Sequence, residues 1–292
     1  MNVNRTLMEL MRSEWLISFE GLRAFAPIAH QIISGQKIVF EKNTSALVTI
    51  IDENGKRVQS DKNDKLIIPK SSVAIVDMVG PVMKYSDWCN YGADEIVAAL
   101  KSAESNPNII GTILNVDSPG GAVSAIGPFI QFGKDKKKPV ISVVDQCASL
   151  GFWAACAISD YKMADNNISA SIGSVGVVST FTDNRKYLES IGYVFHEVYA
   201  DESEYKNLAY KLALEGEYKM IKKEILSPLA IKFQEAVRAA CPNLKEEVGV
   251  LTGKTFGADD AVKYGMIDAV GSLDQAINRL HIMSESKHYT NY

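Results

Sequence analysis

Short apolar runs alternate with amphipathic stretches from residue 72 onward, and this alternation constrains the fold more than any other feature of the chain. The runs VAIVDMVG, IIGTILNVDS and PVISVVDQ are typical of buried strands, and the helical stretches ADEIVAALKSAESN and AVSAIGPFIQFGKD lie between them. Strands that alternate with helices indicate parallel pairing with right-handed crossovers. We therefore predict an α/β domain with a largely parallel sheet.

The residues before this alternation have a different pattern. Residues 1–36 place apolar side chains at helical spacing, which predicts an amphipathic helix. Residues 37–70 are polar and turn-rich, with short strand-like runs such as ALVTII, and this pattern predicts a hairpin or arm outside the main core. We therefore divide the chain into an N-terminal helical and hairpin extension, residues 1–70, and a main domain, residues 71–292.

Two segments in the second half of the chain also carry specific predictions. The run YVFHEVYA, residues 193–200, has the composition of a strand. Residues 207–241 predict a long helical region. Pro228 within it predicts a break or a kink, because proline removes a helical hydrogen bond.

Charge and hydropathy exclude several classes of protein. The formal net charge of the 292 residues is -4, which gives no electrostatic case for nucleic-acid binding. The basic run KDKKK, residues 134–138, favours a solvated helix end over a phosphate site, because cations stabilise the C-terminal end of a helix. No run has the length and apolar character of a signal peptide or a membrane span. We therefore expect a soluble cytoplasmic protein.

The cysteines indicate neither a metal site nor a disulfide framework. Cys89, Cys147, Cys156 and Cys241 form no CxxC pair and no metal-ligand spacing, and no phosphate-binding loop occurs. Free cysteine in an apolar segment behaves as a small hydrophobic residue. We therefore expect reduced thiols, no metal and no cofactor.

A Pro-Gly-Gly turn follows one predicted strand, in the segment NVDSPGG at residues 115–121. Ligands of open α/β sheets gather beyond the carboxyl ends of strands, and glycines there let backbone N–H groups approach a ligand. Such donors stabilise the oxyanion of a tetrahedral intermediate. A plain strand-to-helix turn explains the same residues, so the motif alone leaves both interpretations open.

Ser149 follows the next predicted strand, at the point where a helix begins. The positive end of the helix dipole favours an alkoxide or an oxyanion there, and the backbone N–H of Leu150 would lie beside it. Ser149 is equally suited to cap the helix. Because two consecutive strands bring candidate catalytic groups to one edge of the sheet, we hypothesise that Ser149 is a nucleophile.

A nucleophilic serine requires a base. The histidines have no motif around them, and His196 in a predicted strand fits a structural role better. The remaining base is a lysine with a lowered pKa, as in serine–lysine variants of the catalytic triad. Burial lowers the pKa of a lysine, but composition does not select one of the 31 basic residues.

Four segments in one order resemble the family of signal peptide peptidase A and phage prohead protease C. They are NVDSPGG, ASLGFWAACAISD, IGSVGVV and GKTFGADDAVKYGMIDAVGSLDQAI. The resemblance extends over about residues 72–281. It implies a serine–lysine peptidase of the ClpP/crotonase fold with repeated ββα units. It also implies a homo-oligomer that acts on protein or peptide substrates without a cofactor.

The resemblance assigns the nucleophile and the oxyanion donors. Ser149 matches the nucleophile, although Leu150 stands where the family usually has glycine. Gly120 and Gly121 match the oxyanion glycines. We favour the N–H groups of Gly121 and Leu150 as the oxyanion donors, because leucine in place of the family's glycine keeps the backbone N–H at position 150.

The resemblance also assigns the base. Lys206, in the segment ADESEYKN, matches the family's lysine, with Lys211 as the alternative. The carboxylates at residues 201, 202 and 204 oppose a role of Lys206 as base unless they face solvent. A serine that holds the lysine amine is implied in ASIGSVGV, where Ser174 has the fuller match and Ser171 is the alternative.

We therefore predict an endopeptidase in which Lys206 takes the proton of Ser149 and the serine oxygen attacks the scissile carbonyl. The family divides between membrane-anchored enzymes that degrade signal peptides and phage enzymes that cut scaffold or capsid proteins. With no membrane segment in the sequence, we favour a soluble prohead protease over a cytoplasmic peptidase of the signal-peptide type. It would act in the host cytoplasm or the assembling prohead. The alternatives from other classes are a crotonase-type acyl-CoA enzyme and a catalytically inactive scaffold protein.

Overall fold

A computed structural model of the protein describes residues 14–18, 21, 23, 46–60, 66–86, 91–181 and 183–289. Within these residues the main sheet has eight strands in the order β10-β8-β6-β4-β3-β2, with β7 and β11 continuing from β6. The strands are β2 (Val48–Ile51), β3 (Ser72–Val79), β4 (Ile109–Ser118), β6 (Val140–Ala148), β7 (Tyr161–Ala164), β8 (Ser171–Gly173), β10 (Thr255–Gly257) and β11 (Ala269–Val270).

Most of the pairing in the main sheet is parallel. It is parallel from β3 through β4 and β6 to β8, and also from β6 through β7 to β11. Only the two outer pairs on this path, β2–β3 and β10–β8, are antiparallel. The predicted α/β domain with a largely parallel sheet is confirmed.

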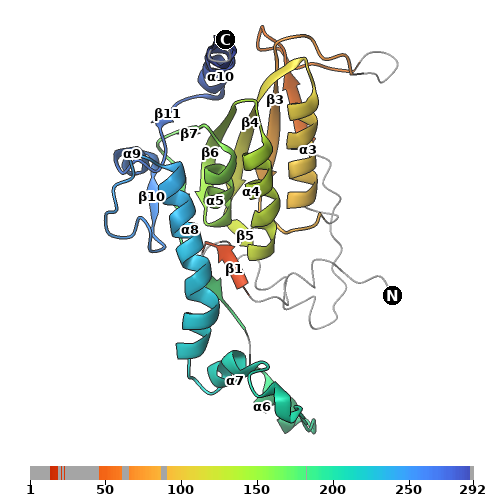
Figure 1. The fold of residues 1–292 in the computed structure, drawn as a ribbon, viewed down its shortest axis with the longest axis vertical. Coiled ribbons are helices and arrows are strands. Elements are labelled where there is room, and N and C mark those ends of the chain that lie inside the picture. The colour runs from red at the N-terminus through yellow and green to blue at the C-terminus, as the bar shows by residue number, and fades with distance from the viewer. Residues whose placement is uncertain are drawn as a thin grey trace.

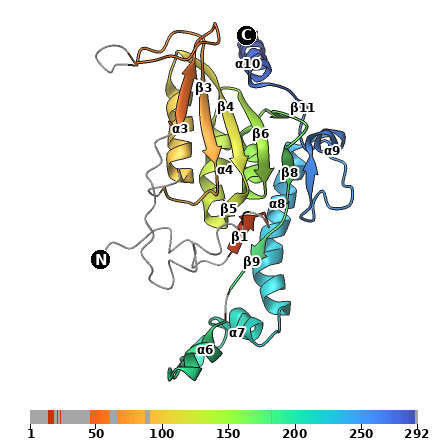
Figure 2. The same ribbon diagram turned by 180° about the vertical axis from the view of Figure 1, so that it is seen from behind.

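Helices cover both faces of this sheet. Figure 1 and Figure 2 show α3 (Ala93–Ser105), α4 (Ile126–Asp135) and α5 (Leu150–Ile158) side by side on one face. Helix α10 (Leu273–Tyr289) packs on the other face, against β4 and β6. Side chains alternate along each strand, so Leu114 joins the apolar core under α3–α5, whereas its neighbour Ile113 packs with α10.

A second, three-stranded sheet lies beyond the end of β4. Its order is β5-β1-β9, with β5 (Gly120–Ala122), β1 (Glu14–Ile17) and β9 (Val178–Ser179), and both pairs are antiparallel. The helix predicted for residues 1–36 is therefore wrong at Glu14–Ile17. Partners on both sides hold these residues extended, and such tertiary pairing overrides local spacing. Most of the remaining predicted helix lies outside the described residues.

Strand β2 also differs from the prediction. It pairs with β3 in the main sheet, and Ile50 is buried. The chain turns after β2, where the Asp52 N–H donates to the Lys56 C=O over 2.9 Å, and it returns along the outer side of β2. The strand-like run ALVTII therefore extends the sheet instead of forming an arm outside the core.

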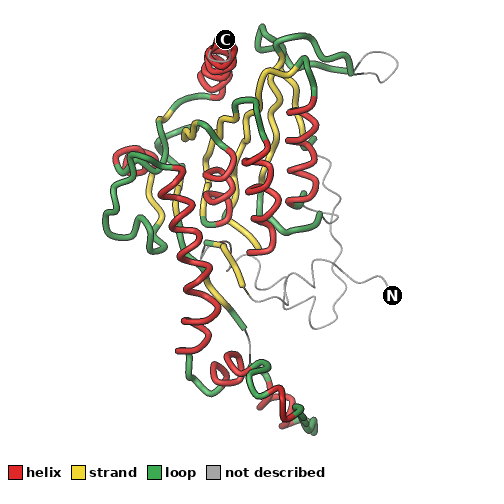
Figure 3. The backbone as a smooth tube through the Cα atoms, in the orientation of Figure 1, coloured by secondary structure: helices red, strands yellow, loops and turns green. Residues whose placement is uncertain are grey.

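Residues 183–226 form an arm that extends away from the main sheet, and α8 (Ser227–Ala240) leads back from it (Figure 1, Figure 3). The arm contains α6 (Arg185–Ser190), η2 (Asp201–Ser203), α7 (Leu208–Leu214) and η3 (Ile221–Leu226). The strand predicted at residues 193–200 is wrong, because these residues are loop. Nearly all of them are exposed, so their apolar side chains have no sheet to join.

The helical region 207–241 is interrupted at Gly216 and not at Pro228. Gly216 has a φ of +88° just after α7, a left-handed conformation that commonly ends helices. The chain then stays helical from residue 219 to Ala240, and Pro228 lies in the first turn of α8. The hydrogen-bond pattern changes directly before Pro228, from the π-helix η3 to the α-helix α8, and such a change accommodates a residue without an N–H donor.

The basic run of residues 134–138 lies at helix ends, as predicted, but it is less solvated than predicted, because the Lys136 side chain is only 9% exposed. Lys138 Nζ donates to the carbonyls of Ala103, at 3.1 Å, and Asn106, at 2.6 Å, where α3 ends. Lys136 Nζ pairs with Asp160 at 2.6 Å. These lysines therefore satisfy carbonyls and a carboxylate of the fold itself.

Candidate active site

Three neighbouring strand ends bring three of the predicted site residues together. The end of β4 pairs with the end of β6, and the end of β6 pairs with β8. Because adjacent strands are about 4.8 Å apart, Gly121, Ser149 and Ser174 emerge side by side. The Ser149 N–H donates to the Gly173 C=O over 2.7 Å, which fixes the serine against the end of β8.

Ser149 has a strained backbone and does not act as an ordinary helix cap. Its φ is 54° and its ψ is -115°, and its side chain makes no capping hydrogen bond to α5. The residue is 1% exposed, and within the described part of the chain its Oγ has no hydrogen-bond partner. A positive φ in a residue other than glycine costs about 1–3 kcal/mol and concentrates at functional sites.

The Pro-Gly-Gly turn needs glycine because two backbones approach it closely. Gly120 has a φ of +111°, and a Cβ there would lie 2.0 Å from the Leu16 carbonyl oxygen. A Cβ at Gly121 would lie 1.9 Å from the Val82 carbonyl oxygen. No side chain fits at either position without moving β1 or the segment around Val82.

Ser118 fixes this turn, a role that sequence reasoning missed. Its Oγ donates to the Gly80 C=O over 2.7 Å and accepts from the Gly120 N–H over 3.2 Å. The Gly120 N–H is therefore used inside the turn. The sequence carries a signal for this role of Ser118, because the serine directly precedes the proline in DSPGG.

Helix α5 begins directly after Ser149. The Trp153 N–H donates to the Ser149 C=O over 3.0 Å, which closes the first turn and leaves the N–H of Leu150 without a partner inside the helix. The Leu150 side chain is fully buried in the main apolar core. The leucine in place of a glycine is thus accommodated by packing.

Ser174 and Ser171 lie at different distances from the nucleophile. Ser171 is opposite Gln146 in the β6–β8 register, three residues before Ser149. Ser174 directly follows β8, with a φ of 55°, and its N–H donates to the Lys254 C=O over 2.9 Å. Ser174 is therefore the nearer of the two to Ser149 along the strands.

Lys206 lies on the arm and is not brought to Ser149 within one chain. It is exposed, between η2 and α7, and its backbone N–H donates to the Ser203 C=O over 3.0 Å. Figure 1 shows α7 near the far end of the arm, whereas α5 lies against the main sheet. The acidic residues 201, 202 and 204 are exposed as well. The fallback, Lys211, is also on the arm, with its Nζ 5.1 Å from the centre of the Tyr199 ring.

The described part of the chain has one buried lysine, Lys162, but it is remote from Ser149. Lys162 is 4% exposed and opposite Ser142 in the β6–β7 register. Ser149 lies seven positions after Ser142 in the sequence, which corresponds to about 23 Å of extended strand. The Lys162 Nζ donates to the Ala240 C=O over 3.2 Å, so it caps the end of α8.

Three cysteine thiols are buried in the core. Cys147, Cys156 and Cys241 are free and buried, as predicted, whereas Cys89 lies outside the described residues. Burial raises the pKa of Cys147 and of Cys156, and for Cys156 the neighbouring Cys241 adds to the effect. Both thiols therefore stay protonated at neutral pH.

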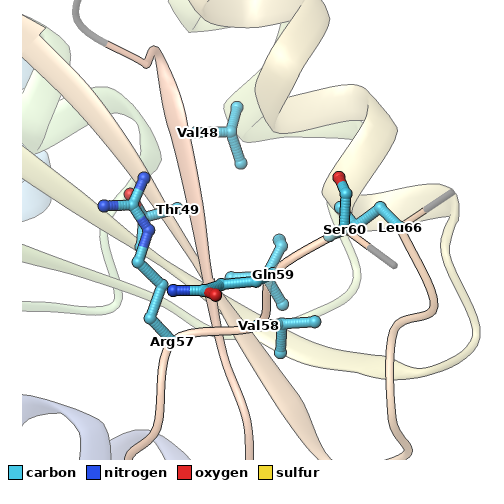
Figure 4. Close-up of a pocket in the computed structure, with 8 residues that line it drawn as sticks. Val48, Thr49, Arg57, Val58, Gln59, Ser60 and Leu66 are labelled. Atoms are coloured by element: carbon cyan, nitrogen blue, oxygen red, sulfur yellow. The ribbon is translucent and has the colours of Figure 1, made fainter. Parts of the chain in front are cut away.

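One cavity lies away from this site. It has a volume of about 380 Å³ and lies beside β2, at the edge of the main sheet (Figure 4). Its lining consists of Val48, Thr49, Ile50, Arg57, Val58, Gln59, Ser60 and Leu66. None of the predicted site residues contributes to it.

The described residues contain no group of three or more His, Cys, Asp and Glu side chains that could hold a metal ion. None of their helices combines the length and the apolar character that crossing a membrane requires.

The chain is similar to several known proteases. Over 251 residues the chain is 26% identical to Protease 4 of Haemophilus influenzae, covering 82% of this chain and 39% of that protein. Over 194 residues it is 27% identical to the chloroplastic serine protease SPPA of Arabidopsis thaliana, covering 63% and 28%. A solved structure of the 1510-N membrane-bound stomatin-specific protease, in complex with a substrate peptide, aligns with a TM-score of 0.47 and 16% identity, covering 72% of this chain and 80% of that one.

The chain spans about two fifths of the length of Protease 4 and less of the plant protein. Residues 133–287, more than half of the chain and including Ser149, Ser174 and Lys206, match the model of peptidase family S49. The protein therefore belongs to peptidase family S49.

Proposed function

We propose that this protein is a serine peptidase with Ser149 as its nucleophile and Lys206 as its base. The observation that carries the proposal is the state of Ser149: a strained backbone, a buried hydroxyl without a partner in the described chain, and a place beside the glycine turn. The fold we propose for the peptidase domain, residues 71–292, is of the ClpP/crotonase type, which the parallel sheet with helices between its strands supports.

The chemistry follows from the donors around the serine. Ser149 Oγ attacks the scissile carbonyl, and its proton passes to the Lys206 amine. The N–H groups of Gly121 and Leu150 stabilise the oxyanion. Gly121 is preferred to Gly120, whose N–H already donates to Ser118. The amine of the leaving peptide takes the proton from Lys206, and water then hydrolyses the acyl-enzyme with the same lysine as base.

Lys206 reaches Ser149 from a second copy of the chain in this proposal. It is exposed on the arm, away from α5. The arm also exposes large apolar side chains, which include Tyr187, Tyr193, Val194, Val198 and Tyr205 at 59–94% exposure. Apolar surface of this extent marks interaction sites. Docking the arm on another copy would bury this apolar surface and also exclude water from around Lys206. A homo-oligomer is therefore part of the proposal.

A fluorophosphonate probe tests the nucleophile. We expect one covalent adduct on Ser149, located by mass spectrometry, and its loss in Ser149→Ala. Ser142→Ala is the matched control, because Ser142 is also a fully buried serine but is hydrogen-bonded to Ser159 at 2.6 Å; its labelling should match the wild type. A folded protein that labels at another serine, or at none across a range of pH, rules out the assignment. The absence of any labelling would fit the inactive scaffold.

The motif resemblance also supports a narrower role. We propose that the substrates are capsid or scaffold precursors of the prohead type, cut in the host cytoplasm or in the assembling prohead. Incubation with a scaffold precursor and, separately, with a synthetic signal peptide tests the choice by mass spectrometry. Cleavage of the signal peptide alone would reject the prohead role and leave the peptidase assignment intact.

A further inference from the structure

Strand β1 lies directly against the glycine turn of the candidate site. Its register pairs are Ile17 with Gly120, Leu16 with Gly121, and Trp15 with both Ala122 and Val178. The Ser18 N–H donates to the Pro119 C=O over 2.7 Å. The segment Glu14–Ile17 therefore lies between β5 and β9 and runs antiparallel to both.

The backbone of Gly121 faces this segment. On the other side of β5, Val82 donates to the Gly120 C=O at 2.9 Å and accepts from the Ala122 N–H at 3.0 Å. Backbone groups of successive residues in a strand point to opposite sides. The N–H and C=O of Gly121 therefore point toward Leu16, so the proposed oxyanion donor faces the peptide backbone of β1.

The Leu16 side chain belongs to the main apolar core. It is fully buried, in the cluster that contains Leu150 and Trp153 of α5. Its neighbours Trp15 and Ile17 point to the other side of β1 and pack with Met83 in a separate small cluster. Leu16 is thus the one residue of β1 that joins the main apolar core, to which Leu150 of α5 also belongs.

Strand addition with one anchored side chain is a general mode of peptide recognition. We propose that the groove between β5 and β9 binds peptides, and that Glu14–Ile17 is its intramolecular, substrate-like occupant. The ligand is an extended segment, antiparallel to β5, with an apolar side chain in the position of Leu16. The inference rests on the proposed function, because it takes Ser149 and Gly121 as the catalytic centre. An incoming peptide must displace β1, which is tethered and so has a high effective concentration.

Displacement is testable without turnover in the Ser149→Ala protein. The probe is a fluorescent peptide of residues 12–20, RSEWLISFE, and the matched control is the same peptide with aspartate in place of Leu16. We expect only the first to bind, by anisotropy. At saturation, hydrogen exchange at the backbone amides of residues 14–18 should accelerate by about tenfold or more, because the displaced strand loses its partners. Saturating binding with unchanged protection at these residues overturns the proposal.

Weakening β1 provides the second arm. Ser18→Pro removes the N–H that donates to Pro119, and Leu16→Asp removes the apolar anchor. In the Ser149→Ala background, each variant that keeps the parent's circular dichroism should bind the probe about tenfold more tightly, because less of the groove is occupied. A folded variant with unchanged affinity contradicts the inference.

The same variants with Ser149 intact separate the two proposals. We expect kcat/KM for a peptide substrate to rise through KM, with kcat unchanged. Tighter probe binding without any peptidase activity would reject the proposed function and keep β1 as the occupant. Peptidase activity that is the same in these variants as in wild type would reject β1 as the occupant and keep the proposed function.

Discussion

Mixing two inactive variants tests whether the catalytic pair forms between copies of the chain. Ser149 is buried at the end of β6, whereas Lys206 is exposed on the arm. Each proposed site takes its serine from one copy and its lysine from a neighbour. In an equal, random mixture of Ser149→Ala and Lys206→Ala chains, half of the serines and half of the lysines are intact. About one quarter of the sites in a closed ring then have both.

The assay is hydrolysis of a fluorogenic peptide by oligomers purified from cells that express both variants with different tags. Each variant alone should be inactive, and the mixture should recover about one quarter of the wild-type rate per site. Wild type mixed with the double variant should retain about one quarter as well, instead of the half expected when both residues come from one chain. An inactive mixture, with oligomers shown to contain both tags, would refute the pairing between copies.

The remaining predictions concern stability, measured by urea unfolding. Gly121→Ala should lower the free energy of unfolding by about 1–3 kcal/mol, because its Cβ would lie 1.9 Å from the Val82 oxygen. Gly127→Ala should raise the free energy of unfolding by about 0.5–1 kcal/mol, because nothing lies within 4 Å of the new Cβ. Equal effects of the two substitutions would contradict the packing argument. Phe233→Ala should cost about 3–5 kcal/mol, because Phe233 is fully buried and stacks on a tryptophan of α5 at 4.7 Å, and a loss below 1 kcal/mol would be inconsistent with that contact. Partial burial of the Asp117 carboxyl, and then the carboxylates Asp145 and Asp165, raise the pKa of Asp117 above 3.8. Ionisation of Asp117 therefore disfavours the folded state, and the contribution of Asp117 to the free energy of unfolding falls as the pH rises through its folded-state pKa. Asp117→Asn should remove this pH dependence and be more stable than wild type at neutral pH. A variant less stable than wild type at neutral pH would contradict the prediction.

Local patterns were sufficient to predict most of the main domain. Buried strands such as β3, β4 and β6 read as continuous apolar runs, and the helices between them have one apolar face, so their order in the chain indicates a parallel sheet. The same order places the glycine turn and Ser149 at the ends of β4 and β6, where strand pairing makes them neighbours. This much of the site follows from sequence, because a parallel sheet aligns the carboxyl ends of its strands.

Local patterns failed where the conformation depends on distant partners. The segment Glu14–Ile17 has helical spacing, but pairing with residues more than 100 positions away makes it a strand beside Gly121. Residues 193–200 have the composition of a strand, but the arm offers them no sheet. The family motif selects Lys206 by its position in the chain, yet only the tertiary structure shows that this lysine stands on an exposed arm, away from Ser149. Sequence by itself determined which elements form and which serine stands at a strand end, since hydrophobic periodicity is local. The tertiary structure decided what lies against that serine, because contacts between distant segments leave no periodic signal in either of them.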